Sequence, residues 1–203
     1  MDAKRIGKIY DKFASKYDAR SFLLEKFVLA KIRRNIFKEL NGDILEVGVG
    51  SGKNLDFYKK SVNLTAVDVG SKMIKIAEKK AKSLRLNARF CLMDAANLEF
   101  PDESFDAVVE TLCLCTFPDP IKTIQEMARV LKQGGCFVFI DHGISSYSFV
   151  RGWQKIFKGI IYKKCGCRLN SNPLVLIKEA GLKIEHLERR FFGIFYIITA
   201  IKS

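Results

Sequence analysis

Three glycines at alternate positions follow a short apolar run, and this feature constrains the fold more than any other. Residues 44–47 have the composition of a buried strand, and Gly48, Gly50 and Gly52 come directly after them. Glycine permits positive φ angles and lets a ligand approach the backbone where a Cβ would collide with it. Asp68 ends the next apolar run, about 20 residues after the first glycine. The pattern predicts a strand–turn–helix unit that binds a nucleoside, with a carboxylate that accepts hydrogen bonds from the ribose.

The spacing of the turn distinguishes between classes of nucleotide. A dinucleotide fingerprint requires a small residue where Lys53 stands, and a phosphate-binding Walker loop requires Ser or Thr where Asn54 stands. The sequence from Glu46 to Gly52, Glu-x-Gly-x-Gly-x-Gly, instead resembles motif I of the class I S-adenosylmethionine-dependent methyltransferases. The resemblance implies S-adenosyl-L-methionine as the cofactor and S-adenosyl-L-homocysteine as the product.

Strand and helix patterns alternate along the middle of the chain. Strands are expected at 43–47, 63–67, 88–92, 105–111 and 136–141, and helices at 52–60, 71–84 and 119–132. Ser71 is well placed to cap the helix that begins there. Such alternation indicates an α/β fold with a parallel sheet covered by helices on both faces. With two more strands at 182–186 and 192–201, the resemblance implies a Rossmann-like seven-stranded sheet of order 3-2-1-4-5-7-6, with strand 7 antiparallel.

The length of 203 residues is typical of a single domain. Within residues 1–203 we expect four parts. They are an N-terminal helical cap at 1–40, built from helices at 4–18 and 21–40, a cofactor-binding core at 41–141, a substrate-side helical segment at 142–180, and a terminal strand hairpin at 181–203.

The resemblance also assigns residues to the cofactor. The expected contacts are Tyr17, Glu46, Gly48, Gly50, Gly52, Asn54, Asp68, Val69, Met73, Asp94, Ala95 and Thr111. In the family, the acidic residue at Asp94 and its neighbour Ala95 meet the adenine, and a cap tyrosine such as Tyr17 lies beside the methionine end. Asp94 equally fits a turn former, and Tyr10 and Tyr17 equally fit simple helix packing.

His142 follows the strand at 136–141 and is the best acid–base candidate in the chain, because imidazole titrates near neutral pH. It also fits a spectator that hydrogen-bonds the backbone. The chain has six cysteines and two histidines. The pairs Cys113/Cys115 and Cys165/Cys167 are Cys-x-Cys and lack the Cys-x-x-Cys spacing of a zinc knuckle, so no metal site is expected.

The formal net charge of +13 suggests an anionic partner, either a phospholipid surface, a nucleic acid or an acidic metabolite. It fits a solubility feature equally well. A basic aromatic helix is expected at 146–164, with Trp153, Ile156, Phe157 and Ile160 on one face. Such a helix can lie in lipid headgroups, close over a substrate, or bury its aromatic side. Without a membrane-spanning run or a secretion signal, a cytoplasmic location is expected, with peripheral membrane contact as a further option.

Two short signatures indicate a branch of the family. The segments 111–120 and 166–170 resemble bacterial phospholipid N-methyltransferases and methyltransferase-like thiol methylases. The expected function is methyl transfer to an amine, thiol or other nucleophile of a small or lipid-like acceptor. The alternative is a non-catalytic S-adenosylmethionine-binding module that acts through its basic surface on a membrane or protein partner. A nucleic-acid acceptor is disfavoured, because residues 110–115 lack an Asn/Asp-Pro-Pro-Tyr/Phe motif. Nothing in the sequence indicates an oligomeric state.

Overall fold

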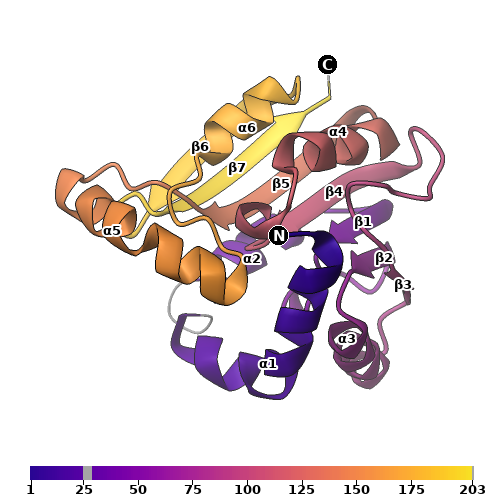
Figure 1. The fold of residues 1–203 in the computed structure, drawn as a ribbon. Coiled ribbons are helices and arrows are strands. Elements are labelled where there is room, and N and C mark those ends of the chain that lie inside the picture. The colour runs from indigo at the N-terminus through magenta and orange to yellow at the C-terminus, as the bar shows by residue number, and fades with distance from the viewer. Residues whose placement is uncertain (25–28, 203) are drawn as a thin grey trace.

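A computed structural model describes residues 1–24 and 29–202, with the side chains of 15–24 excepted. Its centre is one sheet of order β3-β2-β1-β4-β5-β7-β6 (Figure 1). The strands are β1 (Asp43–Val47), β2 (Asn63–Asp68), β3 (Ala88–Leu92), β4 (Phe105–Thr111), β5 (Leu131–His142), β6 (Lys183–Arg190) and β7 (Phe195–Ile201). β7 runs antiparallel to β5 and β6, and the remaining neighbours are parallel. The predicted fold class and strand order are confirmed.

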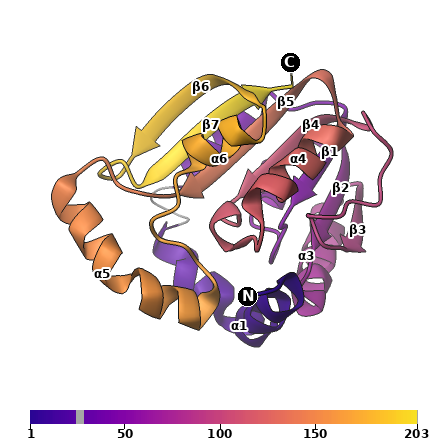
Figure 2. The ribbon, with the colours of Figure 1, turned by 45° about the horizontal axis from the view of Figure 1, so that its top comes forward.

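Helices cover both faces of the sheet. They are α1 (Ala3–Leu24), α2 (Ala30–Phe37), α3 (Ser71–Leu84), α4 (Pro120–Val130), α5 (Ser148–Cys165) and α6 (Pro173–Glu179), with short 3₁₀ helices η2 (Leu55–Phe57) and η3 (Leu114–Thr116). Side chains of α4 and α6 join the apolar core on one face, and those of α2, α3 and η2 join the core on the other. α1 and α5 meet where the N-terminal amine donates to the Tyr162 hydroxyl at 3.2 Å (Figure 2).

The prediction of a helix at 52–60 is wrong. Turns lead from Gly52 into the single 3₁₀ turn of η2, which ends at Tyr58 in an extended conformation. Gly52 has a φ of +79°, which a right-handed helix cannot contain. In addition, the Asn54 side chain points inward and bonds Glu46 and Thr111, so this segment serves as a brace behind the glycine turn.

The N-terminal helices also differ from the prediction. α1 continues to Leu24, and α2 occupies only Ala30–Phe37 of the helix predicted at 21–40. Residues 25–28 lie outside the described part of the chain. Ser71 does not cap α3. Instead Asp11 of α1 accepts hydrogen bonds from the backbone N–H groups of Lys72 at 2.9 Å and Met73 at 3.4 Å. A carboxylate at a helix N-terminus is stabilising, and here it fastens α1 to α3.

The C-terminal third follows the prediction with shifted boundaries. β5 begins at Leu131 rather than at residue 136, because Phe105 pairs with Leu131 and Ala107 with Cys136, so residues 132–135 bulge between two pairings. β6 continues to Arg190 before the hairpin turn. No described helix has the length and apolar content of a membrane span.

Candidate functional site

A pocket opens at the carboxyl ends of β1, β2 and β4, beneath the N-terminal half of α1. Its walls are Ala3, Ile6, Gly7, Tyr10, Gly48, Gly50, Val67, Asp68, Val69, Met73, Met93, Asp94, Ala95, Thr111, Leu112, Cys113, Thr116, Phe117 and Pro118. Eight of the predicted cofactor residues are among them: Gly48, Gly50, Asp68, Val69, Met73, Asp94, Ala95 and Thr111. This is the edge where parallel α/β sheets bind ligands.

The glycine turn forms the floor of this pocket. Gly48 has a φ of +72°, and a Cβ built on it would lie 2.4 Å from Cys113 Sγ, so only glycine fits here. The Gly48 N–H donates to Val67 O at 2.9 Å, which holds the turn against the end of β2. The turn therefore presents bare backbone to the pocket, as the sequence predicted.

Asp68 connects the glycine turn to the start of α3. One carboxylate oxygen accepts from the Gly50 N–H at 2.8 Å, and the other accepts from the Gly70 N–H at 2.7 Å. Burial raises the pKa of Asp68, and the backbone hydrogen bonds oppose the shift. A carboxylate has about four lone-pair sites, so the Asp68 oxygens can accept further hydrogen bonds from a ligand. Asp68 lines the pocket, and its contact with the hydroxyls of a ribose remains a prediction.

Glu46 and Asn54 lie behind the pocket wall rather than on it. Glu46 is only 1% exposed. The Asn54 side-chain amide donates to Glu46 Oε1 at 2.8 Å and to Thr111 Oγ1 at 2.7 Å, so it ties β1 to β4 behind the glycine turn. Gly52 is also absent from the lining residues, and Tyr17 has its side chain outside the described residues. Burial raises the pKa of Glu46 to about 7, against the lowering effect of the Asn54 hydrogen bond.

The raised pKa of Glu46 predicts a pH dependence of stability. Between about pH 4.5 and pH 7 the folded chain holds a proton on Glu46 that the unfolded chain has lost, so the free energy of unfolding falls as pH rises through this window. Glu46→Gln keeps the acceptor for Asn54 and removes the titration. Relative to this variant, the wild type should lose up to roughly 3 kcal/mol across the window and change little above it. Urea unfolding at several pH values measures the difference, and parallel curves would contradict the assignment.

α1 supplies residues that the sequence reasoning missed. Ala3, Ile6 and Gly7 line the pocket, and Tyr10, weighed only as a packing residue or a cap contact, lies there too. A Cβ on Gly7 would lie 2.4 Å from Val69 O, so glycine lets the helix approach the end of β2 closely. A glycine inside an otherwise regular helix was the available signal for this contact.

Asp94 lies at the start of the loop that follows β3. Its Oδ1 accepts from the Ala96 N–H at 3.0 Å, and its backbone oxygen accepts from the Asn97 N–H at 2.9 Å. Asp94 therefore forms a turn and also lines the pocket beside Ala95. The two interpretations left open by the sequence are compatible, because one carboxylate oxygen remains available to a ligand.

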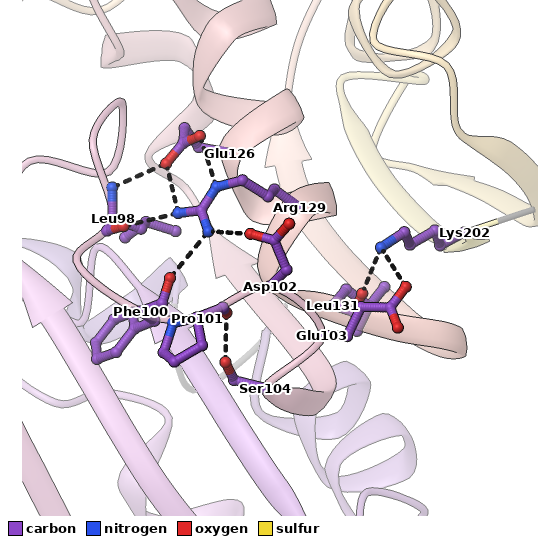
Figure 3. Close-up of polar contacts among 10 residues, drawn as sticks. All are labelled: Leu98, Phe100, Pro101, Asp102, Glu103, Ser104, Glu126, Arg129, Leu131 and Lys202. Carbon is purple, nitrogen blue, oxygen red and sulfur yellow. Dashed lines mark hydrogen bonds and ion pairs between the residues drawn. The ribbon is translucent and has the colours of Figure 1, made fainter.

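Arg129 of α4 holds that loop in place (Figure 3). Its guanidinium donates to the carbonyl oxygens of Leu98 at 2.7 Å and Phe100 at 2.9 Å, and to Asp102 Oδ1 at 2.7 Å. Glu126 accepts from both Nε, at 3.0 Å, and Nη2, at 2.9 Å. The hydrogen bonds with Glu126 and Asp102 raise the pKa of Arg129 above its ordinary value. The planar five-donor fork of arginine suits such an arrangement, and lysine cannot reproduce it.

Arg129→Lys is expected to loosen residues 94–104 without unfolding the chain. The side chain is partly exposed, so we expect a loss of about 1–2 kcal/mol in the free energy of unfolding. Amide hydrogen exchange should accelerate between Ala95 and Ser104, and cofactor affinity should fall several-fold. Arg34→Lys, at an exposed position on α2, is the matched control. Unchanged exchange in the loop would show that Arg129 does not hold it.

Two buried carboxylates shape the wall after β4. Leu112 has a φ of +57°, and the bend brings the N–H groups of Cys113 and Leu114 to Glu110 Oε1 at 2.6 and 2.8 Å. Asp141 Oδ2 accepts from the Cys115 N–H at 3.2 Å. Burial raises the pKa of Glu110 well above its ordinary value, and the charge of Asp141 raises it further. Burial likewise raises the pKa of Cys113, a thiol that lines the pocket, and the charge of Glu110 raises it further.

His142 does not lie on the pocket wall. Its Nε2 is 3.3 Å from Cys167 Sγ, in the connection between α5 and α6. Burial lowers the pKa of His142, but Cys167 and Asp141 outweigh burial and bring it to about 9. Its role as a catalytic acid or base remains a prediction, and the lining of the pocket gives it no support.

Known proteins that are similar in sequence to this chain include methyltransferases, which is consistent with a cofactor pocket at this edge of the sheet. Residues 45–139 match a family described as a methyltransferase domain. A phosphatidylethanolamine N-methyltransferase of Cereibacter sphaeroides is 39% identical over 103 residues, which are 50% of this chain and 51% of that protein. The chain thus spans about half the length of this relative. A ubiquinone/menaquinone biosynthesis C-methyltransferase, UbiE, of Rickettsia bellii is 27% identical over 97% of this chain and 92% of its own.

Solved structures share the fold. A S-adenosylmethionine-dependent methyltransferase of Methanosarcina mazei has a TM-score of 0.65 at 26% identity, covering 79% of this chain and 92% of its own. The [4+2]-cyclase SpnF has a TM-score of 0.79 at 18% identity, covering 100% of this chain and 97% of its own, a likeness of fold alone. Residues 45–139 thus match a methyltransferase domain, and the chain is similar in fold to class I S-adenosylmethionine-dependent methyltransferases. This similarity indicates S-adenosylmethionine as the cofactor.

Proposed function

We propose that this chain transfers a methyl group from S-adenosylmethionine to an amine or other nucleophile of a lipid-like acceptor, which it reaches at an anionic membrane surface. The observation that carries the proposal is the orientation of α5. This helix buries a glutamine and exposes its aromatic side, the reverse of an ordinary helix in a soluble domain.

Gln154 is the buried residue of α5, at 3% exposure. Its side-chain oxygen accepts from the Ser145 N–H at 2.9 Å, and its amide donates to the carbonyl oxygens of Gly143 at 2.9 Å and Leu169 at 3.0 Å. Every one of these partners is a backbone group in a loop that flanks the helix. The network fixes the rotation of α5 about its axis, and this rotation turns the apolar side outward.

The exposed apolar side continues onto the hairpin between β6 and β7. We call it the apolar ridge, and it consists of Tyr147, Phe149, Trp153, Ile156, Ile160, Phe191 and Phe192. Phe149 is 89% exposed and Ile156 is 72% exposed. The rings of Tyr147 and Phe192 meet edge to face at 5.7 Å, which joins the helix to the hairpin. A contiguous exposed patch of this kind marks an interaction site.

The charges around the ridge indicate what covers it. α5 carries no aspartate or glutamate, and its basic residues are Arg151, Lys155, Lys158, Lys163 and Lys164. Aromatic and aliphatic side chains flanked by lysines suit the boundary between lipid headgroups and acyl chains, where the lysines meet anionic phosphates. The names of the two relatives, which refer to phosphatidylethanolamine and to ubiquinone and menaquinone, favour an acceptor of the same lipid-like class.

The main catalytic task of the pocket is to align the reacting atoms. The sulfonium of S-adenosylmethionine already activates the methyl group, so holding the nucleophile, methyl carbon and sulfur in line supplies roughly 7–11 kcal/mol of barrier lowering. Asp68, the glycine turn and the loop after β3 would hold the cofactor. α1 and residues 113–118 would form the walls of the acceptor side.

Transfer of label tests the activity. Purified protein is incubated with methyl-labelled S-adenosylmethionine and either anionic vesicles that contain phosphatidylethanolamine or a lipid extract of cells. Label should appear in the chloroform-soluble fraction, and Asp68→Ala should abolish it. Label in water-soluble metabolites alone would replace the lipid-like acceptor with a small soluble one. No transfer to any fraction, despite firm cofactor binding, would favour the non-catalytic binding module.

A further inference from the structure

One cysteine from each Cys-x-Cys pair meets His142 behind the cofactor pocket. The ligand atoms of Cys115, His142 and Cys167 all lie within 4.8 Å of one another. Cys115 and Cys167 are buried and His142 is half-buried. Around a tetrahedral zinc ion, sulfur and nitrogen ligands at about 2.0–2.3 Å from the metal lie roughly 3.3–3.8 Å apart. Small side-chain movements would therefore bring the three atoms to zinc-binding distances.

Neither Cys-x-Cys pair has the spacing of a zinc knuckle by itself. Within each Cys-x-Cys pair, one cysteine belongs to a helix, Cys115 to η3 and Cys165 to α5, and the other lies just outside it. The fold instead brings together Cys115 of η3, His142 at the end of β5, and Cys167 just after α5. These positions are distant in sequence, so no local motif reveals them.

Cys165 is not one of the three residues whose ligand atoms all lie within 4.8 Å of one another, but its side chain is hydrogen-bonded to Cys167. Cys165 Sγ also donates to the Ile161 carbonyl oxygen of its own helix turn, at 3.3 Å. Three thiols and one imidazole are a set of ligands that zinc uses in structural sites.

The site joins segments that other bonds already hold together. The Arg168 N–H donates to Cys115 O at 3.0 Å, and the Arg168 side chain donates to the carbonyl oxygens of Phe117 and, at 2.9 Å, Pro118. Phe117 and Pro118 line the cofactor pocket. A metal here would lock the connection after α5, and with it the base of the apolar ridge, to the pocket wall.

We propose that Cys115, His142 and Cys167, with Cys165 as the fourth ligand, bind one Zn²⁺ ion that fixes the α5–α6 connection to the loop after β4. The ion has a structural role, and its binding does not depend on the proposed methyl transfer.

Metal content tests the site directly. The full chain is purified without chelators from zinc-supplemented medium, and zinc is measured by inductively coupled plasma mass spectrometry. About one zinc per chain is expected. Cobalt that replaces zinc should give intense visible bands of a tetrahedral ion and thiolate-to-cobalt charge-transfer bands. Cys115→Ser and Cys167→Ser should lose both signals, and Cys165→Ser should weaken binding and change the cobalt spectrum.

Cys91→Ser and Cys136→Ser are matched controls, since both half-buried thiols lie outside the cluster. They should keep one zinc per chain. Wild-type protein that binds S-adenosylmethionine, and is therefore folded, but takes up neither zinc nor cobalt would overturn the proposal. Equal zinc loss in the control variants would overturn it as well, and a cobalt spectrum unchanged by Cys165→Ser would overturn the four-ligand site.

Discussion

Asp68→Ala should weaken binding of S-adenosylmethionine by several hundred-fold. A ribose offers two hydroxyls to the Asp68 carboxylate, and a hydrogen bond to a charged group contributes about 1.5–3 kcal/mol, so a combined loss of about 3–4 kcal/mol is expected. The variant also frees the N–H groups of Gly50 and Gly70, which the carboxylate holds in the apo protein. Isothermal titration calorimetry with S-adenosylhomocysteine measures the change directly, and NAD should not bind to either protein.

Asp68→Asn separates these two contributions. Its side-chain oxygen can keep one of the backbone bonds, but the amide lacks the charge, so affinity should fall to an intermediate value. Glu179→Ala removes an exposed carboxylate at the end of α6 and should leave affinity unchanged. If Asp68→Ala binds the cofactor as tightly as wild type, Asp68 does not hold the ribose, and the assignment of the glycine turn loses its main support.

Local patterns in the sequence were sufficient to place most strands and the glycine turn, and the resemblance to a known family supplied the strand order. The strands around Gly48 and Asp68 have apolar runs with clear ends, and the predicted bounds of β1, β3 and β4 and of α3 match the structure. Parallel strands bring their carboxyl ends to one edge, so residues at those ends meet without any further information.

The remaining features depend on contacts between distant segments. The cap of α3 comes from Asp11, and the loop beside Asp94 depends on Arg129. Periodicity showed that α5 is amphipathic, but it could not show that buried hydrogen bonds of Gln154 turn the apolar side outward. For the same reason, no local motif shows that Cys115 lies close to His142, because the two residues are distant in sequence.

Reversing two charges beside the apolar ridge should abolish binding to anionic vesicles. Each lysine near such a surface contributes up to about 1 kcal/mol, so Lys155→Glu with Lys158→Glu changes four charges and should cost as much as roughly 4 kcal/mol. Sedimentation with vesicles that contain phosphatidylserine measures the partition coefficient. Added salt should weaken wild-type binding in the same assay, since the Debye length falls to about 10 Å at 0.1 M.

The aromatic contribution needs its own variant. Phe157 is half-buried and packs on Trp153 with ring centroids 4.7 Å apart, so its removal would disturb the helix. Phe149 projects freely, and Phe149→Ala should weaken partitioning by about 2 kcal/mol, because part of a large aromatic surface no longer leaves water. This loss should persist in high salt, unlike the loss from charge reversal.

A matched charge reversal on another helix decides whether the ridge itself is the contact. Lys75 and Lys79 are exposed on α3, and Lys75→Glu with Lys79→Glu gives the same net charge as the α5 variant. If the ridge faces the membrane, the α3 variant keeps most of its binding and the α5 variant loses it. Equal losses would mean that the protein responds to its total charge. If the wild type does not bind vesicles at low salt, the membrane contact is excluded. In that case α5 is better explained as a lid over a small soluble acceptor.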